Sequence, residues 1–348
     1  MDYTKQYINN SVIIEDKKKE VCVVSEQTFS SLSSLTTYKK VVDISKHHKI
    51  YGLTQNDYNE VLEKIKKQNC FLEYNYIYDK ISGTQIPLKD LVISANHNPN
   101  RYHALIQNRI NTLSNEAKEK NLSPLFMTLT LPSEFHKMKI DKKTKTLIAN
   151  PKCNHVTPKE AVKHLTKMFS KLRHDRSLKE LSKDERIYFR VNEPHKNGTP
   201  HTHVLLFVPK SSIHRVVTAF KRLFDNKAND IQTNIENATS YIMKYINKTL
   251  PLSKKENLSK KDKYLNAWYC KHRIIRFNCS KTLAPLSLYR LLHEKFNLKE
   301  LTSLIKKKSL AIYVLQTNKN KIMEIFFGDE LIYQRSENYT LRNGLLDF

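Results

Sequence analysis

Glycine is scarce in this chain, with only five among 348 residues. These five do not form a Gly-x-x-x-x-Gly-Lys-Ser/Thr phosphate loop or a Gly-x-Gly-x-x-Gly dinucleotide motif. The sequence therefore argues against an ATP-driven motor of the phosphate-loop type within these residues. A motor that unwinds strands would have to come from a partner.

Cysteines and long apolar runs are also few. The five cysteines are odd in number and include no Cys-x-x-Cys pair, which favours a reduced protein and gives no support for a zinc ribbon. No apolar run approaches the ~20 residues that cross a bilayer. The first residues, Met1 to Lys5, lack the apolar core of a signal peptide. We therefore expect a cytoplasmic protein, in a bacterial host, that has no membrane partner.

Acidic residues are outnumbered by basic ones, 34 against 60, so the formal net charge is +26. Such a field attracts polyanions, and nucleic acid is the usual one. An anionic membrane surface is the competing partner. A general preference for lysine in the source proteome would also raise the charge, so charge alone does not decide between these readings.

The pattern of apolar residues predicts an α+β fold. Residues 1–45 are polar and partly repetitive, and residues 30–37 read as a loop or a loosely ordered arm. Helices are expected at 54–68, 101–120, from Thr157 onward, at 212–225 and at 237–249, and strands at 71–78, 125–131, 187–191, 201–208 and 231–235. Residues 251–263 read as a basic linker, and a small β-meander is expected at 310–316, 322–327 and 331–334. Because strict βαβ alternation is missing, we expect a central antiparallel sheet with helices on one face.

Two histidines alternate on the strand 201–208. The side-chain period of a strand is two, so His201 and His203 face the same way and can hold one metal ion. Glu193 ends the neighbouring strand of the expected hairpin and is placed to be a third ligand. Mg²⁺ and Mn²⁺ accept such mixed ligands, and open positions would take phosphate oxygens. The alternative is a strand whose two histidines merely face solvent.

Two tyrosines lie at helical spacing about forty residues later. At ~100° per residue, Tyr241, Tyr245, Lys244 and Lys248 fall within about a third of the circumference of one helix. A phenol has a pKa near 10 and needs a nearby cation to act as a nucleophile at neutral pH. Its attack on phosphorus would expel a 3′-hydroxyl and leave a 5′-phosphotyrosine. The alternative is that both tyrosines are packing residues.

Three ordered segments resemble the motifs of the phage replication gene A protein family. They are Leu125-Phe126-Met127-Thr128-Leu129-Thr130-Leu131-Pro132-Ser133-Glu134-Phe135-His136, then Arg190 to His195 with Gly198-Thr199-Pro200-His201-Thr202-His203, then Tyr241-Ile242-Met243-Lys244-Tyr245-Ile246-Asn247-Lys248. The second is similar to the histidine–hydrophobe–histidine site of HUH endonucleases, and the third to their two-tyrosine motif. Order and spacing agree over about residues 96–295. Thr202 departs from the family, where a bulkier apolar residue is usual.

The resemblance implies a rolling-circle initiator that nicks and rejoins DNA. It implies His201, His203 and Glu193 as metal ligands, Tyr241 and Tyr245 as alternating nucleophiles, and Lys244 at the phosphate. Together with the pattern of expected elements, it divides the chain into an N-terminal region of unknown role (1–95), an HUH endonuclease core (96–250), a basic linker with a helical extension (251–295) and a C-terminal β-rich element (296–348), and the first and last of these carry no resemblance to the family. Implied partners are single-stranded or supercoiled origin DNA and the host helicase, single-strand-binding protein and polymerase.

Several basic residues are further candidates for DNA contacts, and several alternative functions stay open. We expect Lys248, Arg190, Arg273 and Arg276 to contact the DNA backbone, which would make binding salt-dependent. A two-tyrosine transposase or mobilisation relaxase would carry the same site. A catalytically inert basic DNA-binding regulator, or an RNA-binding module with exposed sheet aromatics, would not need the catalytic set.

Overall fold

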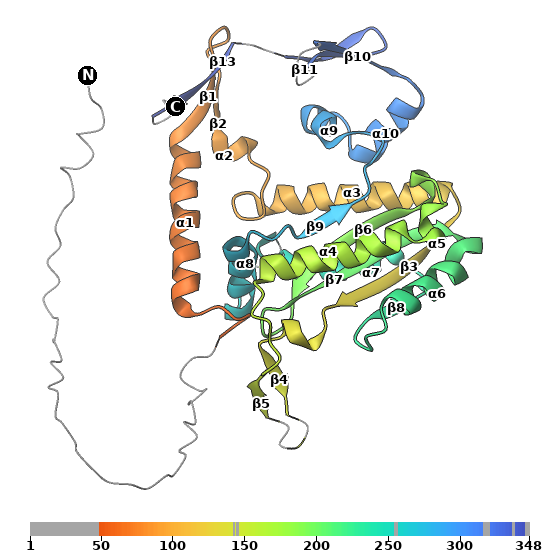
Figure 1. Ribbon diagram of the computed structural model, residues 1–348. Coiled ribbons are helices and arrows are strands. Elements are labelled where there is room, and N and C mark those ends of the chain that lie inside the picture. The colour runs from red at the N-terminus through yellow and green to blue at the C-terminus, as the bar shows by residue number, and fades with distance from the viewer. Residues whose placement is uncertain are drawn as a thin grey trace, which may run out of the picture. The chain divides into compact units, whose positions relative to one another are not determined.

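The computed structural model describes residues 49–141, 143, 146–253, 257–315, 321–335 and 338–344 (Figure 1). The polar residues 1–45, with the loop or arm expected at 30–37, lie outside the described residues. Among the helices that are described, none combines the length and the apolar character needed to cross a membrane.

A five-stranded sheet forms the centre of the structure. Its order is β8 (Asp230–Gln232), β3 (Leu122–Thr130), β7 (Pro200–Pro209), β6 (Ile187–Pro194) and β9 (Phe277–Cys279). Every neighbouring pair in it is antiparallel. The predicted α+β class with a central antiparallel sheet is confirmed, and strands β3, β6 and β7 lie where the apolar runs placed them.

Helices cover both faces of this sheet (Figure 1), whereas the sequence led us to expect them on one. Helices α4 (Pro158–His174) and α6 (Ile213–Leu223) pack on one face. Helices α3 (Pro99–Glu119) and α7 (Ala238–Thr249) pack on the other. The physical reason is that β7 is apolar at consecutive positions from Val204 to Val208, all buried, so both of its sides need a cover.

The ends of several helices follow local signals. Thr157 and Glu160 form the expected capping box at the start of α4. Ser259 and Asp262 form another at α8 (Lys260–His272), so the last four residues of the expected basic linker belong to a helix. Helix α1 (Gln55–Tyr74) continues through aromatic residues that we had expected to begin a strand, and β1 (Asn75–Asp79) starts only after it. At that boundary Nδ2 of Asn75 donates a hydrogen bond of 2.6 Å to the carbonyl of Phe71, and the pairing of β1 in a sheet begins at Asn75.

The remaining elements surround this core. They are β2 (Gln85–Pro87), α2 (Leu88–Leu91), β4 (Met138–Ile140), β5 (Leu147–Ala149), α5 (Arg176–Lys179), α9 (Leu286–Leu292), α10 (Leu298–Lys306), β10 (Leu310–Leu315), β11 (Lys321–Phe327), β12 (Glu330–Gln334) and β13 (Tyr339–Asn343), with short 3₁₀ turns at 133–135, 183–185, 210–212 and 251–253. Strands β10, β11 and β12 form the expected meander. Strand β1 pairs with both β2 and β13, which joins the first and last described segments. The domain boundaries expected from the sequence stay a prediction.

The turn between β6 and β7 is held by two distant segments. Gly198 has φ +88°, and a Cβ there would lie 2.3 Å from the carbonyl oxygen of Tyr51. On another side the indole Nε1 of Trp268, in α8, donates a hydrogen bond of 3.0 Å to the Gly198 carbonyl. The polar ends of β6 and β7 are therefore fixed by residues from before α1 and from α8.

This contact predicts a large effect of Gly198→Ala on stability. Gly83→Ala is the matched control, because Gly83 also has positive φ (+70°) but nothing within 4 Å of a Cβ. The control should cost about 1–2 kcal/mol for the left-handed backbone. Gly198→Ala should cost about 1–3 kcal/mol more, because the backbone of Tyr51 must move. Denaturant unfolding measures both, and equal costs would mean that the close approach carries no energy.

Candidate active site

Three residues with metal-binding side chains converge at one end of the sheet. Glu193 on β6 lies directly opposite His201 on β7, and His203 lies two residues further along β7. The Nε2 atoms of His201 and His203 are 3.6 and 3.5 Å from Oε2 of Glu193, and 3.1 Å from each other. All three residues are buried, with ligand atoms within 4.8 Å of one another. The structure thus brings together the residues expected to be ligands, here called the triad.

The chemistry of the triad fits a divalent cation. Two ring nitrogens 3.1 Å apart cannot both carry a proton toward each other, so the pair would share one proton or together bind one cation. Two buried atoms of the triad, Oε1 of Glu193 and Nδ1 of His201, have no hydrogen-bond partner among the described residues. Buried polar atoms are rarely left without a hydrogen-bond partner. Two imidazoles and one carboxylate are a donor set that Mn²⁺ and Mg²⁺ accept.

The charges around the triad favour an ionised carboxylate at Glu193 and a neutral imidazole at His203. Burial alone would raise the pKa of Glu193, but hydrogen bonds from His201, His203 and Lys248 outweigh it and hold that pKa well below its usual range. The ammonium of Lys248 is 2.8 Å from Oε2 of Glu193. Burial lowers the pKa of His203. Deprotonated imidazole and ionised carboxylate are the forms that bind metal.

Two further histidines extend this cluster. The ring of His195 stacks on that of His201 at a centroid distance of 4.2 Å. The ring centroid of His136 lies 5.4 Å from that of His195. Burial, followed by the nearby His201, lowers the pKa of His195 to about 4. Sequence reasoning did not single out either residue, although both end segments that resemble family motifs. The lowered pKa values of His195 and His136 favour neutral rings, and the ring of His195 packs directly on that of His201.

Strand β3 supports the triad from the other side. Thr128 is paired with His203 in the sheet, and its Oγ1 lies 3.2 Å from Nδ1 of that imidazole. Phe126, on the same face, contacts three rings: His203 at 5.6 Å, Tyr241 at 4.6 Å and Tyr245 at 5.2 Å between centroids. The alternation of β3 could have revealed both residues, because Phe126 and Thr128 are two apart.

Helix α7 presents its two tyrosines to this cluster. Ile242 and Ile246 are fully buried against the sheet, which turns the tyrosine side of the helix toward the triad. The ring centroid of Tyr245 is 4.0 Å from that of His203 and 5.9 Å from that of Tyr241. The hydroxyl of Tyr241 donates to Oε1 of Gln232 at 3.1 Å. Burial, hydrogen bonding with Tyr241 and the charge of Glu193 raise the pKa of Tyr245, so the phenol form of this side chain is favoured.

The two lysines of α7 make different contacts from those that the sequence led us to expect. Lys244, expected beside the phosphate, is exposed and has no ion pair among the described residues. Lys248, expected only as a DNA contact, instead pairs with Glu193.

Among the other expected DNA contacts, only Arg273 is exposed. It ends helix α8 in the left-handed conformation, with φ +51°. Arg190 is buried on the opposite face of the sheet, 4.9 Å from the ring centroid of Phe169. Arg276 is buried over the ring of Tyr269. Each buried guanidinium packs on an aromatic ring of the protein, which makes both arginines structural.

A polar network lies behind the triad and explains Thr202. On the far side of β7 its hydroxyl donates to Oδ1 of Asn192 at 2.7 Å. Nδ2 of Asn192 donates to the Ile275 carbonyl at 2.8 Å, and the hydroxyl of Tyr269 donates to the Asn192 carbonyl at 2.5 Å. Thr202, the departure from the family pattern, thus links the two triad strands to the segment after α8.

Comparison with known proteins gives one family. The model of the bacteriophage replication gene A protein family matches residues 35–252. No solved structure matches the chain.

The relatives that are similar to part of the chain include three phage and prophage proteins. The "Replication protein" of Haemophilus phage HP1 is 32% identical over 184 residues, which cover 48% of this chain and 22% of the relative. The "Probable replication endonuclease from prophage-like region 1" of Salmonella typhi is 26% identical over 248 residues, covering 63% and 30%. The "Replication gene A protein" of Escherichia phage 186 is 27% identical over 227 residues, covering 60% and 31%. The chain thus spans less than a third of the length of each.

The network behind the triad predicts that Thr202→Val is destabilising despite its similar shape. Loss of the hydroxyl leaves the buried Oδ1 of Asn192 without its donor, at a cost of about 1–3 kcal/mol in the free energy of unfolding. Thr112→Val is the matched control. Thr112 is equally buried, but its hydroxyl donates within α3 to the carbonyl of Asn108, four residues earlier.

Because a backbone carbonyl at that position already accepts a helical hydrogen bond, the Thr112 variant should lose less than about 1 kcal/mol. Denaturant unfolding compares the two variants. If Thr202→Val costs no more than the control, the Thr202–Asn192 hydrogen bond does not stabilise the site.

Proposed function

The chain belongs to the bacteriophage replication gene A protein family, and on that premise we propose that it is a rolling-circle replication initiator that nicks and rejoins single DNA strands. The observation that carries the proposal is the position of Tyr245, whose ring lies 4.0 Å from that of His203 in the triad. A phenol beside a buried set of two imidazoles and a carboxylate suits chemistry on a phosphodiester.

The proposed reaction exchanges one phosphodiester for another. The phenol oxygen of Tyr241 or Tyr245 attacks phosphorus, the bond from phosphorus to the 3′ oxygen breaks, and a 5′-phosphotyrosine forms. The phenol loses its proton, and the departing 3′ oxygen gains one. Because the intermediate keeps the energy of an ester bond, a 3′-hydroxyl can later attack it and reseal the strand without ATP. A second tyrosine allows a new cut while the first link persists.

The triad would hold a divalent cation, Mg²⁺ or Mn²⁺, through His201, His203 and Glu193. Such an ion, when bound, offsets negative charge on phosphate oxygens. The protein's own residues do the rest. Phe126 and His203 fix the ring of Tyr245 by packing on it. Lys244, exposed on α7 next to Tyr245 in the chain, is available to a phosphate of the bound strand.

Two alternative functions differ in whether they require the triad and the two tyrosines. A two-tyrosine transposase or mobilisation relaxase would need the same geometry, and it is the names of the similar proteins that favour replication. An inert regulator would not need three buried, converging ligand groups, since burying them is costly without a use. Mapping of the cut site would separate an initiator from a transposase.

We predict that Tyr241→Phe combined with Tyr245→Phe abolishes covalent capture of DNA. The full chain is incubated with single-stranded and supercoiled DNA plus Mg²⁺ or Mn²⁺, and a denaturing gel is examined for a protein–DNA band. Loss of both nucleophiles should lower the adduct by at least about a thousandfold. DNA binding should survive, because neither change removes a charge.

The single variants should differ. Tyr245→Phe should lower the first cleavage more than Tyr241→Phe, because Tyr245 adjoins His203 and the Tyr241 hydroxyl is engaged by Gln232. Tyr58→Phe, at a tyrosine stacked on Tyr264, is the control and should cleave normally. A persistent adduct in the double variant would place the nucleophile elsewhere.

We further predict that His203→Ala and Glu193→Gln each weaken binding of Mn²⁺ by at least about tenfold, because each removes one proposed ligand. Isothermal titration with Mn²⁺ alone, without DNA, measures this independently of activity. His214→Ala, at an exposed histidine of α6, is the control. Undiminished Mn²⁺ binding, or full cleavage in the presence of a chelator, would contradict the ligand assignment.

A further inference from the structure

A basic cavity of about 640 Å³ lies away from the triad. It opens between the end of α3, the segment after α4, strand β6 and the segment that follows β9. Among its fifteen lining residues, two are carboxylates, Glu116 and Asp184, and six carry cationic side chains. The six cations are Lys120, Arg173, Lys183, Arg186, Lys281 and Lys306.

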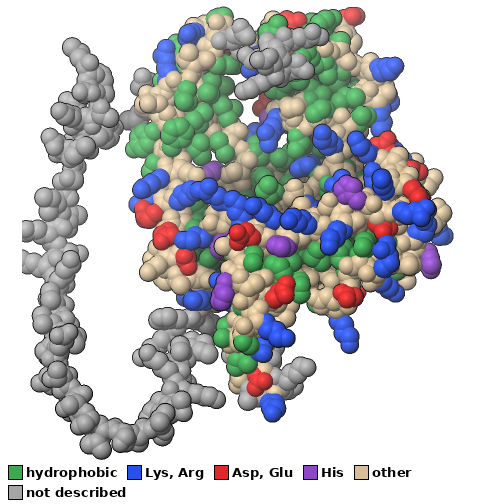
Figure 2. Space-filling view, viewed as in Figure 1, with side chains coloured by type: hydrophobic (Ala, Val, Ile, Leu, Met, Phe, Trp, Pro, Cys, Tyr) green, Lys and Arg blue, Asp and Glu red, His purple; other side chains and the backbone are tan. Residues whose placement is uncertain are grey.

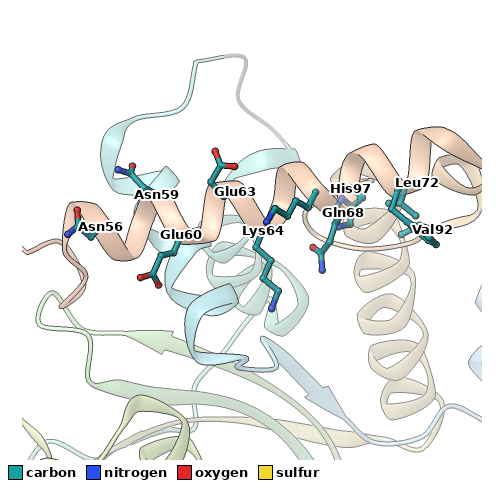
Figure 3. A pocket seen from close by; sticks show the side chains of 11 residues that line it. Asn56, Asn59, Glu60, Glu63, Lys64, Gln68, Leu72, Val92 and His97 are labelled. Atoms are coloured by element: carbon teal, nitrogen blue, oxygen red, sulfur yellow. The ribbon is translucent and has the colours of Figure 1, made fainter. Parts of the chain in front are cut away.

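This concentration of positive charge is local and is not a plain consequence of a basic chain. Figure 2 shows Lys and Arg side chains spread over the face in view. The larger hollow along α1, about 1060 Å³ (Figure 3), nevertheless has balanced charges. Its lining includes two carboxylates, Glu60 and Glu63, and two ammonium groups, Lys64 and Lys67. Glu60 there is also engaged by Lys271. Of the two hollows, only the one beside β6 is strongly basic.

The cavity is separate from the triad. Tyr188 of β6 and Leu206 of β7 line it and are paired in the sheet. Leu206 is five residues from His201, about 17 Å along a strand. Its side chain also belongs to the face packed by α4, whereas the triad lies on the face packed by α7. An anion in this cavity is therefore not the phosphate at the triad.

The cations of the cavity differ in what they can offer. Arg186 donates to the carbonyls of Arg173 and Leu178, and Lys120 is paired with Asp184 at 3.1 Å. Lys183 and Lys281 are exposed and have no ion pair among the described residues. These two lysines are the groups most available to a ligand.

The lining favours contact with a nucleic-acid backbone over contact with bases. Its one aromatic residue is Tyr188, whose ring is packed by Phe169 at 5.0 Å and covered by the guanidinium of Arg173 at 5.5 Å. No free ring is therefore offered by the lining residues for base stacking, which single-strand sites use. Lysines around a hollow suit the paired phosphate rows of a duplex.

We propose that this cavity binds the phosphate backbone of duplex DNA, at a place distinct from the strand that enters the triad. The choice of DNA as the polyanion rests on the proposed function. Held there, the duplex beside the cut site would stay attached to the protein while the nicked strand moves at the triad.

Charge reversal tests the proposal. The double variant Lys183→Glu/Lys281→Glu is compared with a control, the double variant Lys66→Glu/Lys80→Glu. The control has the same net charge, but its two exposed lysines lie outside the cavity. Fluorescence anisotropy with a 20-base-pair duplex of arbitrary sequence is measured over a range of NaCl concentrations. The cavity variant should bind at least about tenfold more weakly, and its salt slope should fall by about two, one unit for each phosphate that a lysine no longer neutralises. The control should change by less than about threefold.

Three results would overturn the proposal. They are unchanged duplex binding, equal weakening in the control variant, and tighter binding of duplex RNA than of duplex DNA. Thermal melting of each variant verifies that it is folded.

A separate measurement keeps this proposal distinct from the proposed function. Adduct formation with a short single-stranded oligonucleotide should be unchanged in the cavity variant, and a parallel loss would make the cavity part of the triad's own path. If the wild-type chain forms no adduct with any DNA but the duplex result stands, the proposed function fails and the cavity assignment survives.

Discussion

The antiparallel register between β6 and β7 is the constraint on which the site depends. Glu193 faces His201 across this pair, and His203 follows on the same side. A slip of one residue would turn the histidines to the face of α4 and leave the carboxylate on the other side of the sheet. The register is fixed at the turn, where Gly198 fits against the backbone of Tyr51 and accepts a hydrogen bond from Trp268.

The site arises where an apolar face of the sheet becomes polar. Along β7, Leu205 and Phe207 pack under α3 and α7, and the next positions on that face toward the turn are His203 and His201. Helix α7 crosses this boundary. Its isoleucines stay in the apolar part, while Tyr245 reaches the imidazole of His203. The polar groups of the site thus lie next to the packed core. Charges there are weakly screened by water and interact strongly with one another.

Buried charge of this kind must be compensated, and the structure does so on two sides. The ammonium of Lys248 and both imidazoles contact the carboxylate of Glu193, which keeps it ionised despite burial. On the far side of the strands, Thr202 and Asn192 satisfy each other and bind the backbone after α8. Such satisfied networks hold a site in one geometry, whereas an unpaired member would destabilise it.

Much of this could be predicted from the sequence because it depends on local periods. The strand period placed His201 and His203 on one side, the helical period placed Tyr241 and Tyr245 together, and Thr157 marked the start of α4. These features follow from backbone geometry over a few residues.

Only the tertiary structure decided which groups meet across the chain. Spacing along α7 could not tell that Lys248, rather than Lys244, reaches Glu193, or that Phe126 packs on both tyrosines. It could not tell that Arg190 is buried under α4, or that β1 pairs with β13 near the other end of the chain. The physical reason is that packing brings together residues that are far apart in the sequence. The energy of such a contact depends on the shape and chemistry of both partners, and a local sequence pattern describes only one of them.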